Sequence, residues 1–302
     1  MEKMSEASEI LSAALGGFQE HKSAAVELSR EILPRSVWFA DRRLKIDQCG
    51  TFIRLQADAE NSASMQLVAS NLCRLRLCPM CEWRLSLRRF VALQAAVDQI
   101  GSASAWLHLV LTTPNVSGDE LSSAITALFG RFRAFWKKSA PPSWLGFYRG
   151  LEVTYNAEED TYHPHFHVLV SVRESYFKSR DYLSQAALQD LWGSIVFVKR
   201  IRDLGSGIAE VVKYACKPLR VSDRFSADRA AAVYDVLAGA LHGRRMVQAG
   251  GNVQEALRTL GRLAELNELT EGTDQTDEAR ESFGFYWHFK ENKYVPISGQ
   301  EV

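Results

Sequence analysis

The sequence predicts an α+β fold, in which helices pack on one face of an antiparallel sheet. Two observations carry this prediction. Strand-like segments, rich in β-branched and aromatic residues, are few and are mixed with helical segments along the chain. The two strand-like segments at its centre, 144–156 and 161–170, are joined by a short polar turn, which favours a β-hairpin.

The remaining elements are expected in the following order. Residues 1–33 read as helical and end near Pro34, because proline cannot continue a helix. Short strands at 51–56 and 65–70 lead into a cysteine knuckle and a helix with a basic start at 82–100, then a strand at 105–113 and a helix at 118–138. After the central hairpin we expect a helix at 184–196, a strand at 197–202, a short helix from Gly-Ser-Gly to Pro218, alanine-rich helices at 226–242 and 252–268, and a terminal hairpin at 283–296.

Three of the seven histidines lie at alternate positions of the second central strand, His163, His165 and His167. Alternate side chains of a strand point to the same face, so the three imidazoles share one face while Phe166 and Val168 occupy the other. Neutral imidazoles that converge in this way are typical metal ligands. A single histidine would more often be a structural residue, but three at this spacing favour a metal site.

The preceding strand adds a carboxylate to that face. Glu152 and His165 are equally distant from the midpoint of the turn, so they should lie opposite each other in the hairpin. One carboxylate with two imidazoles leaves coordination positions open. This composition suits Mg²⁺ or Mn²⁺ acting on a phosphate better than a closed structural site.

Four of the five cysteines cluster in the sequence, Cys49, Cys73, Cys78 and Cys81. The Cys-x2-Cys pair at Cys78 and Cys81 allows two thiolates from one turn to share a tetrahedral Zn²⁺. Cys49 and Cys73 lie next to the two short strands, and a hairpin there would bring them together as the other two ligands. We therefore expect a structural zinc site.

The short helix before Pro218 carries Glu210 and Tyr214 one turn apart, and Lys213 and Lys217 form a similar pair. A tyrosine beside a metal-bound phosphate can attack phosphorus, and a carboxylate one turn away can act as a general base. The lysines suit phosphate oxygens. Taken alone, a tyrosine and a glutamate on a helix are usually surface residues. The pair gains significance because the same chain contains the histidine strand.

Three segments in this order resemble the rolling-circle plasmid replication initiators of the HUH endonuclease superfamily: Leu111–Asn115 (LTTPN), His163–Val170 (HPHFHVLV) and Glu210–Pro218 (EVVKYACKP). His165-Phe166-His167 matches the His-hydrophobe-His element that names the superfamily. Tyr214 matches its nucleophilic tyrosine, and Glu210 matches the glutamate of the single-tyrosine initiators. His163 lies outside the matched pair and is only an additional candidate ligand. Relatives often carry a comparable Cys-Pro-x-Cys element.

The resemblance implies a ferredoxin-like or RRM-like sheet with the metal on its open face. It also implies that Tyr214 nicks one DNA strand at the plasmid origin, which leaves a 5′-phosphotyrosine and a free 3′-OH that primes a host polymerase. Glu210 would then serve as base when the round terminates by strand transfer or hydrolysis. The sequence contains no GxxxxGK[ST] motif, so we expect dependence on a host helicase.

The net charge is zero, but the basic residues are unevenly distributed. The segment 73–89 has five arginines, Arg74, Arg76, Arg84, Arg88 and Arg89, against one glutamate, whereas 255–281 is acidic. Basic clusters of this kind favour contact with DNA, either single-stranded or extruded as a hairpin. No apolar run is long enough to span a membrane, and the first residues suggest an amphipathic helix rather than a secretory signal, which predicts a cytoplasmic protein.

Four regions are expected: an N-terminal helical segment (1–45), a zinc-binding element (46–90), an HUH endonuclease domain (91–222) and a C-terminal helical and hairpin region (223–302). Two other functions remain open. The same chemistry serves single-tyrosine transposases and mobilisation relaxases, although in relaxases the tyrosine typically precedes the histidines. The chain could also be a non-catalytic, zinc-stabilised DNA-binding regulator. Whether it acts as a monomer or a homodimer is also left open.

Overall fold

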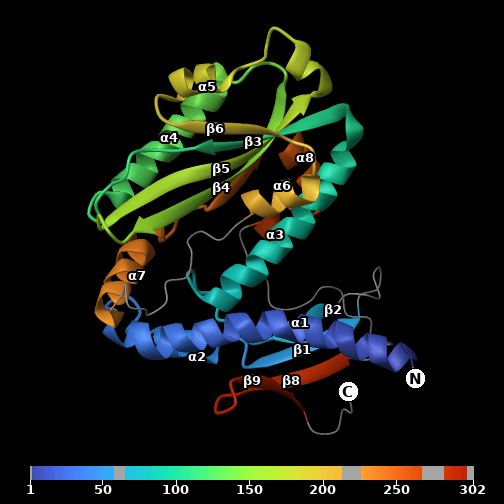
Figure 1. Cartoon of the computed structure of the whole chain (residues 1–302), viewed down its shortest axis with the longest axis vertical. Helices are drawn as coiled ribbons and strands as arrows, with labels where there is room; N and C mark the ends of the chain where they lie inside the picture. Colours follow the sequence, from blue (N-terminus) through green and yellow to red (C-terminus); the bar gives the residue numbers. More distant parts are fainter. Residues whose placement is uncertain (1, 58–64, 213–225, 267–281, 298–302) are drawn as a thin grey trace. The chain divides into compact units, whose positions relative to one another are not determined.

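The computed structural model describes residues 2–57, 65–212, 226–266 and 282–297, and the chain divides into two compact units (Figure 1). The first unit comprises Met1–Trp83, Arg220–Ala232 and Leu269–Val302, and the second comprises Arg84–Leu219 and Val233–Glu268. Every strand pairing among the described residues is antiparallel. The predicted α+β class is therefore confirmed.

The second unit contains a five-stranded sheet in the order β6-β3-β5-β4-β7. Its strands are β3 (Ser104–Leu111), β4 (Trp144–Asn156), β5 (Thr161–Arg173), β6 (Val196–Ile201) and β7 (Val247–Gly250). Helix α4 (Leu121–Ser139) connects β3 to β4, and α5 (Gln185–Trp192) lies between β5 and β6. This β-α-β-β-α-β succession with the strand order β6-β3-β5-β4 is ferredoxin-like, as expected. The short β7, which was not predicted, extends the sheet beside β4.

The two faces of this sheet have different surroundings. On one face, Phe132 of α4 packs edge-on against Phe147 of β4 and Phe166 of β5, with ring centroids 5.0 and 5.4 Å apart. Side chains alternate along a strand, so Glu152, His165 and His167 lie on the opposite face. Helix α6 (Leu204–Val211) packs against β5 and β3, and its last residue approaches Gly150 on the face of Glu152.

Three predicted helices have different limits in the structure. Helix α5 ends at Trp192 instead of continuing to residue 196, because Gly193 adopts a left-handed conformation (φ 73°) and β6 begins at Val196. Helix α8 spans Gly251–Thr259, shorter than the predicted 252–268, because Gly261 adopts a left-handed conformation (φ 69°) and a separate 3₁₀ turn follows at Ala264–Leu266. Helix α6 begins at Leu204, so Gly205 and Gly207 lie inside it rather than at its start. A Cβ at Gly207 would stand 2.7 Å from the Ile201 side chain, which explains why a glycine occupies this helix interior.

The first unit has a four-stranded sheet in the order β2-β1-β8-β9. Its strands are β1 (Phe52–Ala57), β2 (Met65–Ser70), β8 (Ser282–His288) and β9 (Lys293–Pro296). Both predicted hairpins form, and the antiparallel pairing of β1 with β8 joins them. This pairing connects segments more than 200 residues apart, which no local pattern could predict.

The helices of the first unit are α1 (Glu2–Glu27) and α2 (Arg43–Gln48), with a π turn at Leu28–Ile32 and a 3₁₀ turn at Leu33–Arg35 between them. Helices α3 (Pro79–Ile100) and α7 (Ala227–Leu241) have residues in both units. Short 3₁₀ turns follow α3 at Gly101–Ala103 and β5 at Glu174–Lys178. Among the described residues, no helix combines the length and the hydropathy that a membrane span requires.

Candidate metal centre and active site

Glu152, His165 and His167 form a compact group on one face of the β4–β5 hairpin. Glu152 pairs directly with His165 in the strand register, as predicted from the turn, and each of the three side chains is buried. Their candidate ligand atoms all lie within 4.8 Å of one another. Glu152 Oε2 is 2.9 Å from His167 Nε2 and 3.5 Å from His165 Nε2. The expected composition of one carboxylate and two imidazoles is therefore present in a geometry that a divalent cation can use.

The outer nitrogen of each histidine is held by a hydrogen bond. His165 Nδ1 is 3.0 Å from the His163 carbonyl oxygen, to which only a protonated Nδ1 can donate. His167 Nδ1 is 3.0 Å from Nε2 of His108, a buried residue of β3. These bonds leave both Nε2 atoms facing Glu152 and available to a cation. His108 was not predicted as a partner of the histidine strand, although it lies on a correctly predicted strand.

The electrostatics of the group favour an ionised carboxylate. Burial by itself would raise the pKa of the Glu152 carboxyl, but its contacts with the His165 and His167 rings outweigh burial and hold this pKa below its usual range. A carboxylate that stays ionised can bind a cation without first losing a proton.

His163 is not a member of the three-residue group. Its ring stacks on that of His165 with a centroid separation of 4.9 Å, and its side chain is half-buried. Burial lowers its pKa, and the nearby His165 lowers it further. A neutral His163 beside His165 supports the metal group by packing, and its backbone carbonyl orients the neighbouring ring.

Helix α6 ends beside Glu152, His165 and His167, which are called the metal group below. The carbonyl oxygen of Val211 lies so close to Gly150 that a Cβ there would stand 3.0 Å from it, and Gly150 pairs with His167 in the strand register. Glu210, in the last turn of α6, is half-buried. Tyr214, Lys213 and Lys217 lie outside the described residues, so their predicted roles stay predictions.

The predicted DNA-binding arginines differ in exposure. Arg74 is exposed, and Arg76, Arg84 and Arg88 are half-buried. Arg89, in contrast, is only 3% exposed and lines a pocket of the second unit together with Glu152, Gly150, His167 and Val211. Its position in this pocket was not predicted from the basic composition of 73–89.

The four clustered cysteines converge in the first unit. Cys49 follows α2, Cys73 follows β2, and Cys78 and Cys81 lie at the start of α3, so the β1–β2 hairpin brings the pairs together as expected. The sulfur of Cys81 is 3.5 Å from that of Cys49 and 3.6 Å from that of Cys73, and all four sulfurs lie within 4.8 Å of one another. Zinc–sulfur bonds of about 2.3 Å in a tetrahedron place the sulfurs about 3.8 Å apart. The group therefore fits one Zn²⁺.

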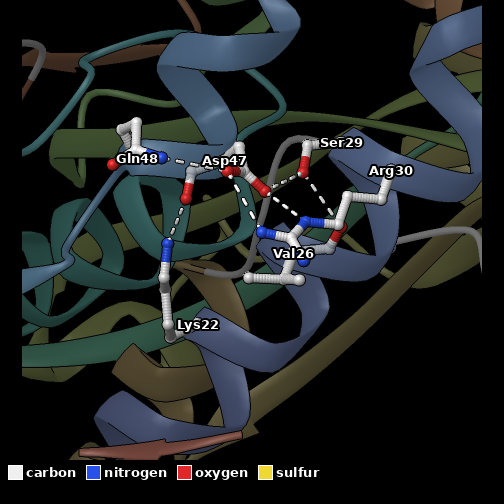
Figure 2. A network of polar contacts seen from close by, with 6 residues as sticks. All are labelled: Lys22, Val26, Ser29, Arg30, Asp47 and Gln48. Carbon is white, nitrogen blue, oxygen red and sulfur yellow. Dashed lines mark hydrogen bonds and ion pairs between the residues drawn. The ribbon is translucent and has the colours of Figure 1, made fainter. Parts of the chain in front are cut away.

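Two backbone amides donate to these sulfurs, and a buried lysine binds the backbone near Cys49. The amides of Cys73 and Arg74 donate to the sulfurs of Cys49 and Cys81 at 3.3 and 3.2 Å. Lys22 of α1 is fully buried and donates to the carbonyl oxygen of Asp47, two residues before Cys49 (Figure 2). Burial lowers the pKa of Lys22 to about 8, although Cys49 and Asp47 partly oppose this shift.

The Asp47 carboxylate anchors α1 to α2 beside the cysteines. It accepts hydrogen bonds from Ser29 Oγ at 3.1 Å, Arg30 Nε at 2.7 Å and Gln48 Nε2 at 3.0 Å (Figure 2). Burial would raise its pKa, but the hydrogen bond from Arg30 contributes to holding it below the usual range. The N-terminal helix is thus tied by polar contacts to the segment that presents Cys49.

Comparison with known proteins places these features in a family context. The family model described as "Replication protein" (Rep_1) matches residues 64–295. The chain is 35% identical over 187 residues to "Protein rep" of a Bacillus sp, covering 58% of this chain and 60% of that protein. It is 33% identical over 195 residues to "Protein rep" of Streptococcus pneumoniae (59% and 60%) and 30% identical over 238 residues to that of Lentilactobacillus hilgardii (72% and 74%). The chain thus spans about 60% of the length of the first two relatives. No solved structure matches.

Proposed function

The chain belongs to the Rep_1 family of replication proteins, and we propose that it initiates rolling-circle plasmid replication by nicking one strand of the origin DNA. The resemblance drawn from the three sequence segments is confirmed at the level of the family. The observation that carries the proposal is the buried group of Glu152, His165 and His167, whose ligand atoms lie within 4.8 Å of one another beside the end of α6.

Glu152, His165 and His167 would hold Mg²⁺ or Mn²⁺. When bound, such an ion polarises the scissile phosphate and neutralises charge that develops on its oxygens. His108 and the His163 carbonyl orient the two imidazoles, which keeps Nε2 of each directed at the site. His163 is at most an additional ligand, because it lies outside the group.

Tyr214 is the proposed nucleophile. Its phenolic oxygen forms a bond to phosphorus and loses its proton to solvent, while the bond between phosphorus and the 3′-oxygen breaks and this oxygen takes up a proton. The products are a 5′-phosphotyrosine and a free 3′-OH. Tyr214 follows Val211 by three residues, so the covalent chain keeps the two Cα atoms within about 11 Å. Since Val211 contacts the strand that carries Glu152, this reach is compatible with attack at the metal group.

Other residues would serve termination and DNA binding. Glu210 would accept the proton of the water or hydroxyl that resolves the phosphotyrosine. Lys213, Lys217 and the arginines Arg74, Arg76, Arg84 and Arg88 would contact phosphates of the origin DNA, single-stranded or in a hairpin. Zn²⁺ held by the four cysteines would stabilise the first unit. A host polymerase would extend the 3′-OH, a host helicase would separate the strands, and the reaction would take place in the cytoplasm.

The proposal is tested by covalent-adduct formation. The full chain is incubated with Mn²⁺ and labelled single-stranded oligonucleotides that tile the plasmid origin, and adducts are separated on a denaturing gel. We expect one oligonucleotide to give an adduct that needs Mn²⁺ and is absent from Tyr214→Phe and His167→Ala. An adduct that persists in Tyr214→Phe would disprove the nucleophile. If no oligonucleotide reacts, the chain is a DNA-binding regulator instead.

The role of Glu210 needs a separate assay. A preformed adduct of Glu210→Ala should release its DNA more slowly than the wild-type adduct, while its formation proceeds normally. Release at the wild-type rate would exclude Glu210 as the base of termination.

A further inference from the structure

Arg89 is a buried cation to which the proposed nicking mechanism assigns no role. It lies in the middle of α3 and is 3% exposed. Its Nε donates a hydrogen bond of 2.8 Å to the carbonyl oxygen of Leu266. This bond holds the guanidinium in one orientation, and with respect to the described residues it leaves the two terminal guanidinium nitrogens available to other acceptors.

Within the described parts of the second unit, no carboxylate forms an ion pair with Arg89. Glu152 lines the same pocket, but its carboxylate lies against His165 and His167. The phenol of Tyr148 is also near Arg89, but burial raises the pKa of this phenol to about 12, so it stays neutral. A guanidinium that is buried without an anion is costly, so the binding of an anion beside it would be favourable.

The pocket that Arg89 lines can receive one oxygen-sized group. Its cavity volume is about 10 Å³, and it opens to solvent. Arg89, Glu152 and His167 line it together with Gly150 and the end of α6, and Leu151, Met246 and Val247 form its apolar part. An anion in this pocket would meet a fixed guanidinium and a divalent cation at the same time.

We propose that Arg89 binds a non-bridging oxygen of the DNA phosphodiester that occupies the metal group. The planar guanidinium donates paired hydrogen bonds that match the oxygens of a phosphate, and a buried donor interacts more strongly than an exposed one. Arg89 is therefore a residue for one specific phosphate rather than a member of a general basic surface. This inference rests on the proposed function and names the group that orients the phosphate for attack.

The first test uses inorganic phosphate as the probe and the full chain with its zinc retained. Mn²⁺ affinity is measured by the EPR signal of free Mn²⁺, and phosphate binding is measured by the broadening of the ³¹P resonance by bound Mn²⁺. Losing a charged hydrogen bond weakens binding about tenfold to a hundredfold. We expect this loss of phosphate affinity in Arg89→Gln, with Mn²⁺ affinity unchanged. Arg180→Gln, which removes an exposed arginine of the same unit, is the matched control and should bind phosphate like the wild type.

Two outcomes would overturn the inference. Wild-type phosphate affinity in Arg89→Gln would show that Arg89 does not meet the anion, and a parallel loss of Mn²⁺ affinity would show that it only shapes the metal group. Should Arg89→Gln fail to fold, Arg89→Lys decides, because it keeps the charge but loses the paired donors. It should bind phosphate several-fold more weakly than the wild type, and equal binding would refute the proposal.

The second test separates this inference from the proposed function. If Arg89→Gln loses phosphate affinity but no oligonucleotide is ever nicked by the wild type, Arg89 is an anion ligand and the nicking proposal fails. If the wild type nicks DNA and Arg89→Gln nicks it at the same rate, the nicking proposal stands and the Arg89 inference fails. A slower nick by Arg89→Gln, with normal Mn²⁺ affinity, supports both.

Discussion

Replacing Gly150 by alanine should slow DNA nicking without weakening the binding of Mn²⁺. Gly150 lies on β4 between Tyr148 and Glu152, and the Val211 carbonyl at the end of α6 rests against it. An alanine Cβ would stand 3.0 Å from this oxygen, whereas an ordinary contact begins at 3.4 Å. Either β4 or the end of α6 must therefore move by about 0.4 Å.

The size of the effect follows from this displacement. The strand is held on both sides by β5 and β7, so the end of α6, which leads to Tyr214, is the part that should yield. A misplacement of about 1 Å in a reacting group can reduce the rate roughly a hundredfold. A shift of about 0.4 Å should then slow adduct formation roughly three- to tenfold, and Gly150→Val should slow it further.

The assay compares the rate of covalent adduct formation under single-turnover conditions with the Mn²⁺ affinity of the same preparation. Gly130→Ala is the matched control, because Gly130 lies in α4 and an added Cβ meets nothing within 4 Å. It should nick at the wild-type rate and gain about 0.5–1 kcal/mol of stability from better helix propensity. Nicking by Gly150→Ala at the wild-type rate would refute the idea that α6 delivers the nucleophile.

Three further predictions concern the two clusters and the helix that flanks one of them. Cys81→Ser should lose the zinc, measured as zinc per chain by atomic absorption; a full equivalent of zinc in this variant would exclude the four-cysteine site. His108→Leu should weaken Mn²⁺ binding about 10–100-fold, because His167 loses its orienting partner; unchanged affinity in the EPR assay would contradict this. Asp47→Ala should lower the free energy of unfolding by about 2 kcal/mol, since its buried carboxylate accepts hydrogen bonds from several side chains, whereas Glu255→Ala, which breaks an exposed ion pair, should leave the urea midpoint unchanged. Equal effects of the last two substitutions would show that burial does not decide the strength of these pairs.

Much of the metal group could be predicted because its geometry is local. A strand has a side-chain period of two, and a hairpin fixes which residues face each other across a short turn. These two rules are enough to place Glu152 opposite His165 and to put both on the face of His167. The cysteine cluster follows similarly from a hairpin and a Cys-x2-Cys knuckle.

Other parts depend on contacts between distant segments. The neighbour of His167 is His108, which precedes it by 59 residues, and the pairing of β1 with β8 has no local signal. The burial of Arg89 was also unpredictable, because an arginine in a basic run is usually exposed. Tyr214 remains a prediction from the sequence, since it lies outside the described residues.

The sequence by itself therefore determined two chemical groups of this protein: one histidine strand with its facing carboxylate and one four-cysteine cluster. These features follow from the period and turn chemistry of single elements. Only the tertiary structure decided which of these groups share a pocket, because burial and charge pairing arise where remote strands and helices meet. The tertiary structure places Arg89 in the pocket that Glu152 and His167 line. It also places His108 within hydrogen-bonding distance of His167 Nδ1.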